Sequence, residues 1–195
     1  MHIVKRQVTA SVSPLPWLEL FGNAALSQNK IKDFDEVVED WDDWYGNPDA
    51  GTYHCDGNGD EYRSIHYDNS TLAFSPSAIL NGFIDFKFGN FKATWHTGYV
   101  SRQYLDNTEN NDRSLPAYSL SDLSFSYNIP MKKVCNSIVI GADFNNILNA
   151  RCATAGWVYS AIYESGGHGN DNRYYQIGFI PAAPFSALAH ITIKF

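Results

Sequence analysis

The chain has 195 residues, of which 44% are hydrophobic and only 18% charged, and its formal net charge is -7. The basic residues are scattered, which argues against a nucleic-acid partner, and no run of eighteen apolar residues could form a transmembrane helix. Aromatic residues reach 15%, an excess that favours β structure, either in a core or in the aromatic girdles of a membrane barrel.

Alternation of apolar with polar or small residues is the dominant pattern, and it predicts about seven long strands. In chain order these strands cover residues 3–13, 18–31, 71–88, 91–102, 122–129, 137–145 and 186–195, the third with an interruption at Pro76. One face of the fifth and sixth strands carries Asp122, Ser124, Ser126, Asn128, Asp143 and Asn145. Such a face suits a wide, water-filled lumen better than a packed soluble core.

The connections fall into two classes that alternate along the chain. Short ones lie at residues 14–16, 89–90 and 130–134, and long polar ones at about 35–69, 103–115 and 150–172. In an antiparallel meander, this order places every short turn at one rim and every long loop at the other. Residues 30–44 lack a continuous apolar stripe, so we expect a loop there with at most one helical turn.

Five stretches carry a resemblance to a known family. They are LSQNKIKDFDE (26–36), YVSRQYLDNT (99–108), LPAYSLSDLSFSY (115–127), FNNILNARC (144–152) and IPAAPFSALAHITIKF (180–195). Their order and spacing resemble the last strands of TonB-dependent receptors of the Bacteroidetes type, over nearly the whole chain. The resemblance implies an all-β fold in which residues 1–195 form the C-terminal part of a large transmembrane β-barrel, with long extracellular loops and short periplasmic turns.

The family resemblance also implies a function. Such receptors are outer-membrane transporters that import iron chelates such as siderophores, haem, cobalamin or glycans, energised by the TonB system through a plug domain. Large transporters of this kind have 22 strands, so about seven would be the last third. We expect the signal peptide, plug and earlier strands to be absent from this chain, which would then depend on outer-membrane lipid and on the remaining barrel strands and be inactive alone. The small-molecule substrate stays open.

The C-terminus has a signal of its own. Phe195, with Ile191 and Ile193 on the same face of its strand, resembles the terminal signal that the barrel-assembly machinery reads, and an apolar edge strand is open to pairing by another sheet. Alternatively, Phe195 anchors the lipid interface, and the two roles are compatible. We expect Phe195 at the periplasmic rim. Because the number of predicted strands is odd, Met1 then lies at the extracellular rim.

Ligand-binding candidates lie in the long loops. Aromatic and imidazole side chains there could stack on and hydrogen-bond an extracellular ligand; the candidates are Trp41, Trp44, Tyr45, Tyr53, His54 and His168. The alternative is a solvated loop whose aromatic residues pack on each other or on their neighbours.

Metal, disulfide and catalytic patterns are weak. Asp56, Asn58 and Asp60 have the spacing that starts a calcium loop, but Tyr67 stands at the twelfth position and no glycine at the sixth, so we assign no metal. Cys55 and Cys152 would both face the oxidising outside and could form a disulfide, whereas Cys135 belongs to the opposite rim. No nucleophile with a base and no phosphate-binding loop is present, so we expect neither an enzyme nor a cofactor.

Two other classes of protein fit the same patterns. One is a soluble, lipocalin-like β-barrel that carries a small ligand, which would need an apolar interior. The other is a passive porin or adhesin barrel without a plug or energy coupling. The polar face of residues 122–128 argues against the first, whereas the second differs only in residues outside this chain.

Overall fold

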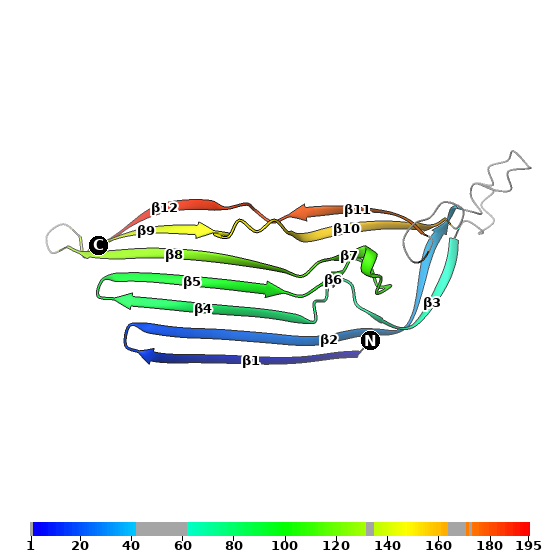
Figure 1. The fold of residues 1–195 in the computed structure, drawn as a ribbon, viewed down its shortest axis with the longest axis horizontal. Helices are drawn as coiled ribbons and strands as arrows, with labels where there is room; N and C mark the ends of the chain where they lie inside the picture. Colours follow the sequence, from blue (N-terminus) through cyan, green and yellow to red (C-terminus); the bar gives the residue numbers. More distant parts are fainter. Residues whose placement is uncertain (1, 42–61, 132–134, 164–170, 172) are drawn as a thin grey trace, which may run out of the picture.

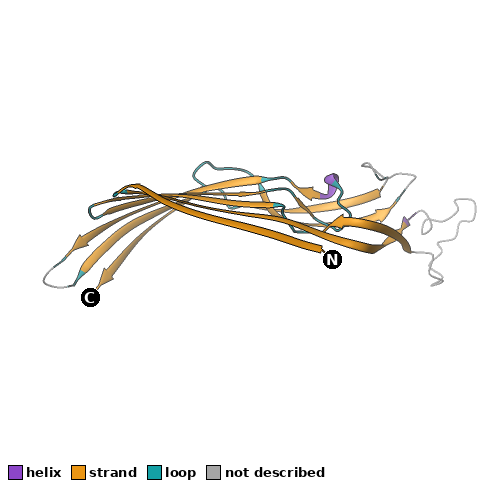
Figure 2. Ribbon diagram, turned by 90° about the horizontal axis from the view of Figure 1, so that it is seen from below, coloured by secondary structure: helices purple, strands orange, loops and turns teal. Residues whose placement is uncertain are grey.

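The computed structural model describes residues 2–41, 62–131, 135–163, 171 and 173–195. It is a long curved sheet, which Figure 1 shows face-on and Figure 2 shows nearly edge-on as a single layer. The main sheet has ten strands: β1 (His2–Leu15), β2 (Leu18–Asp40), β3 (Tyr62–Thr71), β4 (Ala78–Phe88), β5 (Phe91–Val100), β8 (Tyr118–Pro130), β9 (Ser137–Asn145), β10 (Ala153–Ile162), β11 (Arg173–Pro181) and β12 (Ser186–Lys194). The prediction of an all-β protein is confirmed.

Strand lengths explain the shape of the sheet. The first half of β2 pairs with β1 and β4, and its second half outruns β4 and pairs with β3 instead. Strands β9 and β10 lie end to end, as do β12 and β11 beside them (Figure 1). At the far ends of β2 and β10, two residue pairs in parallel register join these strands, so the sheet curls there. Among the described residues, no strand pairs with the outer edge of β1 or of β12.

Each of the seven predicted segments lies on an observed strand, but the expected loops are partly wrong. Residues 35–69 and 150–172 contain strand β3, the end of β2, and strand β10. Both faces of Tyr62–Thr71 are mostly polar, and Ala153–Ile162 mixes small and aromatic residues, so neither shows the alternation that marks a half-buried strand. The expected loop at residues 30–44 is likewise β-strand as far as Asp40.

The pairing register gives the sheet two different faces. One row of neighbours crosses seven strands, and it consists of Val12, Leu20, Ile84, Trp95, Leu123, Phe144 and Ala187. The adjacent row, on the other face, consists of Glu19, Asp85, Thr94, Ser124, Asp143 and Leu188. Because side chains alternate along each strand, the sheet is apolar on one face and largely polar on the other.

The apolar face is uncovered in the described structure. Val12 is 56% exposed and Ile191 is 69% exposed, and many other large side chains of this face are similarly open. The few buried apolar side chains lie mainly where the long connections meet, and include Val38, Leu105, Leu115 and Ile162. Among the described residues, the apolar face of the long sheet therefore has few buried side chains.

Two glycines accommodate large rings from the neighbouring strand. The imidazole of His190 lies over Gly141, and the indole of Trp157 lies over Gly178, so that a Cβ at either glycine would overlap the ring. A third glycine, Gly89, takes a positive φ of 57° in the two-residue turn between β4 and β5, a conformation that favours glycine. The Gly-Asn sequence predicts a short turn at this position.

Candidate binding surface at the loop end of the sheet

The long connections lie at one end of the sheet, which we call the loop end, and the short turns and the C-terminus at the other, the turn end (Figure 1). Three segments meet at the loop end: the β2–β3 hairpin, residues 101–117 between β5 and β8, and the β10–β11 hairpin. The middle segment includes the short strands β6 (Gln103–Tyr104) and β7 (Ser114–Leu115) and the 3₁₀ turn Asn111–Arg113.

Arg113 is the centre of the middle segment and is fully buried. Its guanidinium donates to Asp106 Oδ2 at 2.6 Å, to Thr108 Oγ1 at 2.7 Å and to Asp171 Oδ2 at 2.6 Å. Burial opposes the charge, but the two carboxylates outweigh it, so the pKa of Arg113 is raised. Such a buried cation is tolerated only because its donors are paired.

Arg173 joins the two hairpins. Its guanidinium makes a bidentate pair with Glu36, at 2.9 and 2.8 Å, and also donates to the hydroxyl of Tyr67 at 3.1 Å. Asp171 lies 3.6 Å from Arg173 Nε, so one carboxylate serves both buried arginines. Burial raises the pKa of Asp171, but the hydrogen bond and charge of Arg113 outweigh it, and the net shift is downward.

An aromatic cluster stands beside these ion pairs. The ring of Trp41 stacks on Tyr174 with centroids 4.7 Å apart and has Tyr159 and Tyr163 at 6.1 and 6.2 Å. Trp41 Nε1 donates to Glu39 at 3.2 Å, and the hydroxyl of Tyr159 donates to the same carboxylate. Burial, then Glu39, raises the pKa of Tyr159 to about 12. Trp41 thus packs on neighbouring rings, and its role in ligand binding stays a prediction.

The other predicted site residues divide into two groups. Trp44, Tyr45, Tyr53, His54, Cys55, Asp56, Asn58, Asp60 and His168 lie outside the described residues, so the ligand, calcium and disulfide predictions that depend on them stay predictions. Cys152 and Cys135 are described and half-buried. Ile191 and Ile193 share the apolar face, and Phe195 follows β12 with 87% of its surface exposed.

Several residues that position this surface have no signal in the sequence. Arg113 lies 58 positions before its partner Asp171, Glu36 lies 137 positions before its partner Arg173, and no local pattern marks these pairs. Asn146 had a weak signal, because FNNILN clusters three asparagines, and asparagine tolerates positive φ. Its φ is 49°, and its buried amide bonds the backbone of Ala150 and of Ala183, which holds the two breaks between β9 and β10 and between β11 and β12 together.

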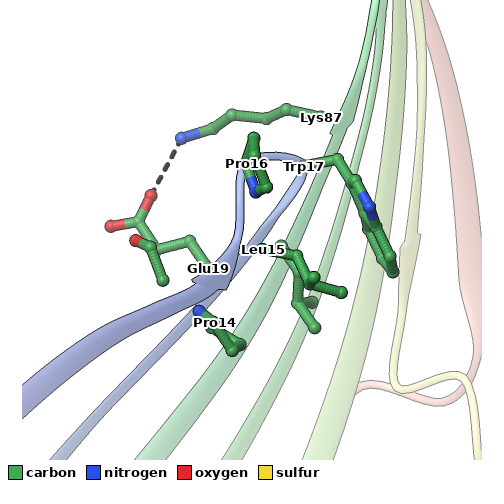
Figure 3. A pocket seen from close by; sticks show the side chains of 8 residues that line it. Pro14, Leu15, Pro16, Trp17, Glu19 and Lys87 are labelled. Atoms are coloured by element: carbon green, nitrogen blue, oxygen red, sulfur yellow. Dashed lines mark hydrogen bonds and ion pairs between the residues drawn. The ribbon is translucent and has the colours of Figure 1, made fainter.

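The turn end carries aromatic and charged side chains around the β1–β2 turn. Trp17 stacks on Phe86 with centroids 6.2 Å apart, and Lys87 Nζ lies 2.9 Å from Glu19 Oε2 (Figure 3). An open hollow of about 410 Å³ lies here, lined by Trp17, Glu19, Lys87 and the prolines of the turn among others. Aromatic rings next to ion pairs are typical of the border between hydrocarbon and water.

The described residues include no group of metal-ligating side chains and no helix long and apolar enough to cross a membrane. No protein-family model, no curated protein and no solved structure matches this chain.

Proposed function

We propose that this chain is the C-terminal part of the β-barrel of an outer-membrane, TonB-dependent receptor. The observation that carries the proposal is the apolar row that crosses seven neighbouring strands, from Val12 to Ala187, with a polar row on the opposite face. A sheet with one uncovered apolar face and one polar face fits a barrel wall between lipid and a water-filled lumen.

The dimensions of the apolar face support the same reading. On β4 it runs from Leu80 to Phe88, a distance of roughly 26 Å at the usual rise per residue of a strand. The apolar band of outer-membrane barrels is about 25 Å tall and is bordered by aromatic girdles. Trp17 and Phe86 would lie in the girdle at the turn end, which we assign to the periplasm, and the loop end would be extracellular.

The polar face weighs against a soluble carrier. Its central residues include a histidine, His96, between Asn81 and Asp122, with ring nitrogens 3.3 Å from each side chain. A barrel that closed on this face would enclose charged and amide groups, whereas a carrier of small apolar ligands needs an apolar interior. A wide lumen filled with water, or with a plug domain, suits these groups better.

Strand directions support a larger barrel. β1 and β12 both run toward the turn end, so an antiparallel closure needs an odd number of further strands between their open edges. The seven side-by-side strands that the apolar row crosses, together with an odd number of further strands, give the even strand number of bacterial barrels. The further strands, the plug and TonB would supply transport, and Ile191, Ile193 and Phe195 would be read by the assembly machinery. We propose no catalytic role.

Insertion into lipid tests the membrane assignment. The chain is refolded with vesicles whose lipids carry bromine at defined depths of the acyl chain, and quenching of tryptophan fluorescence is measured. Trp95 pairs with Ile84, which lies midway along the apolar stretch from Leu80 to Phe88, so the Trp95→Phe variant should lose most of the quenching from bromines near the bilayer centre. A chain that folds as a cooperative monomer in buffer without detergent or lipid would contradict the proposal.

Energy coupling needs a separate test, because a passive barrel has the same apolar face. The measurement is uptake of candidate substrates by cells that carry the complete barrel with this segment, with and without a functional TonB system. TonB-dependent uptake supports a receptor, whereas uptake that is unchanged without TonB would identify a porin.

A further inference from the structure

At the loop end, strands pair in the order β11, β10, β2 and β3 and form a small sheet. One face of this sheet packs on the middle segment, because a Cβ at Gly156 would lie 3.3 and 3.5 Å from the side chains of Leu105 and Leu115. Consecutive side chains of a strand point to opposite faces, so Trp157 points away from the middle segment. We call the face that carries Trp157 the aromatic face.

A row of rings crosses the aromatic face. Trp157 and Tyr159 lie two positions apart on β10 and therefore point to the same side. Tyr159 contacts Trp41, which stacks on Tyr174 of β11, so the row continues into the aromatic cluster. From Trp157 to Ile162, the end of β10, the strand rises roughly 16 Å. The row is therefore long enough for a chain-like ligand.

Trp157 is the most open ring of this row, with 53% of its surface exposed. Its indole lies across Gly178, the residue opposite it on β11, where a Cβ would overlap the ring. One face of the indole therefore rests against the backbone of β11, and the other face is open to solvent. Such a flat, exposed ring can stack on a flat ligand.

Uncharged hydrogen-bonding groups lie next to the open ring. Gln176 is exposed and is paired with Tyr159, one step along the sheet from Trp157. Within the described ranges, neither the indole N–H of Trp157 nor the side-chain amide of Gln176 has a hydrogen-bond partner. Both groups are therefore available to a ligand, and the amide can donate as well as accept.

The charges of the small sheet argue against an anionic ligand. Its arginines, Arg63 and Arg173, are each one position away from a residue of the aromatic face, Tyr62 and Tyr174, and so belong to the opposite face. Among the described residues of β3, β10 and β11, the aromatic face thus has no lysine or arginine that could pair with an acid group.

We propose that the aromatic face binds a neutral oligosaccharide. The C–H groups of one sugar ring contact the open face of Trp157, whose π-system is negative there. Hydroxyls of the neighbouring sugars accept from the indole N–H and exchange hydrogen bonds with the amide of Gln176. The inference goes beyond the proposed function, because these residues bind the sugar whether or not a complete barrel transports it.

The position of Trp157 argues against a place in a membrane girdle. Ala161 pairs with Glu39, which lies roughly 60 Å along β2 from Leu20 of the apolar row. Trp157 precedes Ala161 by roughly 13 Å of strand, which still leaves it far beyond an apolar band about 25 Å tall. Trp157 therefore faces water rather than lipid.

Hexasaccharides of matched length test the ligand class. Their binding to the full chain, in micelles of a detergent without a sugar headgroup, is measured by isothermal titration calorimetry. The neutral probes are the hexasaccharides of glucose, mannose and xylose, and the charged probe is hexagalacturonate. We expect at least one neutral probe to bind about tenfold or more tightly than hexagalacturonate. Failure of all three neutral probes to bind, or equal binding of hexagalacturonate, would overturn the proposal.

Variants of the bound ring test the site. Trp157→Ala should lower the affinity for the best neutral probe about tenfold or more, and Gly178→Ala should also lower it, because the new Cβ displaces the indole. Trp17→Ala is the matched control, since it removes an exposed tryptophan at the turn end. Unchanged affinity in Trp157→Ala, or an equal loss in Trp17→Ala, would contradict the assignment. If Trp157→Ala does not fold, the probe comparison on the unmodified chain still decides, and because it measures no transport, its result is independent of the membrane tests.

Discussion

Asp171 accepts a 2.6 Å hydrogen bond from Arg113 across 58 positions of sequence, and the same carboxylate oxygen lies 3.6 Å from Arg173. Because Arg113 belongs to the middle segment and Arg173 to the β10–β11 hairpin, Asp171 connects two of the three loop-end segments. Arg173 connects to the third through Glu36. The shape of the loop end therefore depends on a few buried charges rather than on a large apolar core.

Replacing Asp171 with alanine should loosen the loop end. The variant leaves Arg113 buried with one carboxylate instead of two, and removing one partner of a buried pair costs about 3–5 kcal/mol. Asp171 is partly exposed, so we expect a smaller loss, about 1–3 kcal/mol, in the free energy of unfolding in detergent micelles. Asp68→Ala is the control, since the Asp68 side chain is fully exposed. Equal urea midpoints for the two variants would contradict this role of Asp171.

The same carboxylate predicts an acid-sensitive loop end. The folded-state pKa of Asp171 is lowered, so its stabilising contribution is complete above the unfolded-state pKa of about 3.9 and is lost as the pH falls through the lower folded value. The protection factors of loop-end amides, which compare their hydrogen exchange with the intrinsic rate at the same pH, should therefore fall below about pH 4. In Asp171→Asn this loss of protection should be weaker. A variant with the unchanged pH profile would show that another group is responsible.

Sequence alone predicts the wall of the sheet better than its loop end. The alternation in β4, β5, β8, β9 and β12 follows directly from having one apolar and one polar face, and the turn at Gly89 follows from its residues. Strand β3 escapes prediction because both of its faces are mostly polar, so backbone pairing with β2 decides its structure. The Arg173–Glu36 pair spans 137 positions, and no local pattern marks such a contact.

Neighbouring residues on β8 allow a matched test of the two faces. Leu123 lies in the apolar row, level with Ile84 at the middle of the apolar stretch of β4, and Ser124 lies in the polar row. A lysine facing lipid near the midplane of a barrel costs about 2–4 kcal/mol, whereas one facing the lumen costs little. We therefore expect Leu123→Lys to reduce the refolded fraction in vesicles sharply and Ser124→Lys to leave it nearly unchanged, measured by the heat-dependent gel shift of folded barrels. Equal yields, or the reverse order, would refute the assignment of the faces.

The ring of His190 over Gly141 predicts an unusual cost for adding a single methyl group. In Gly141→Ala, the new Cβ would overlap the imidazole, which must move away and lose its 3.3 Å contact with Asp143, and Phe125 O would lie only 3.1 Å from the methyl group. We expect a loss of about 1–3 kcal/mol in the free energy of unfolding, as for overpacked sites.

Gly82→Ala is the control for this prediction, because a Cβ at Gly82 has no neighbour within 4 Å. The double variant Gly141→Ala with His190→Ala should recover most of the loss, since the ring is the main obstacle. If Gly141→Ala and Gly82→Ala unfold at the same urea concentration, the imidazole does not occupy the space above Gly141.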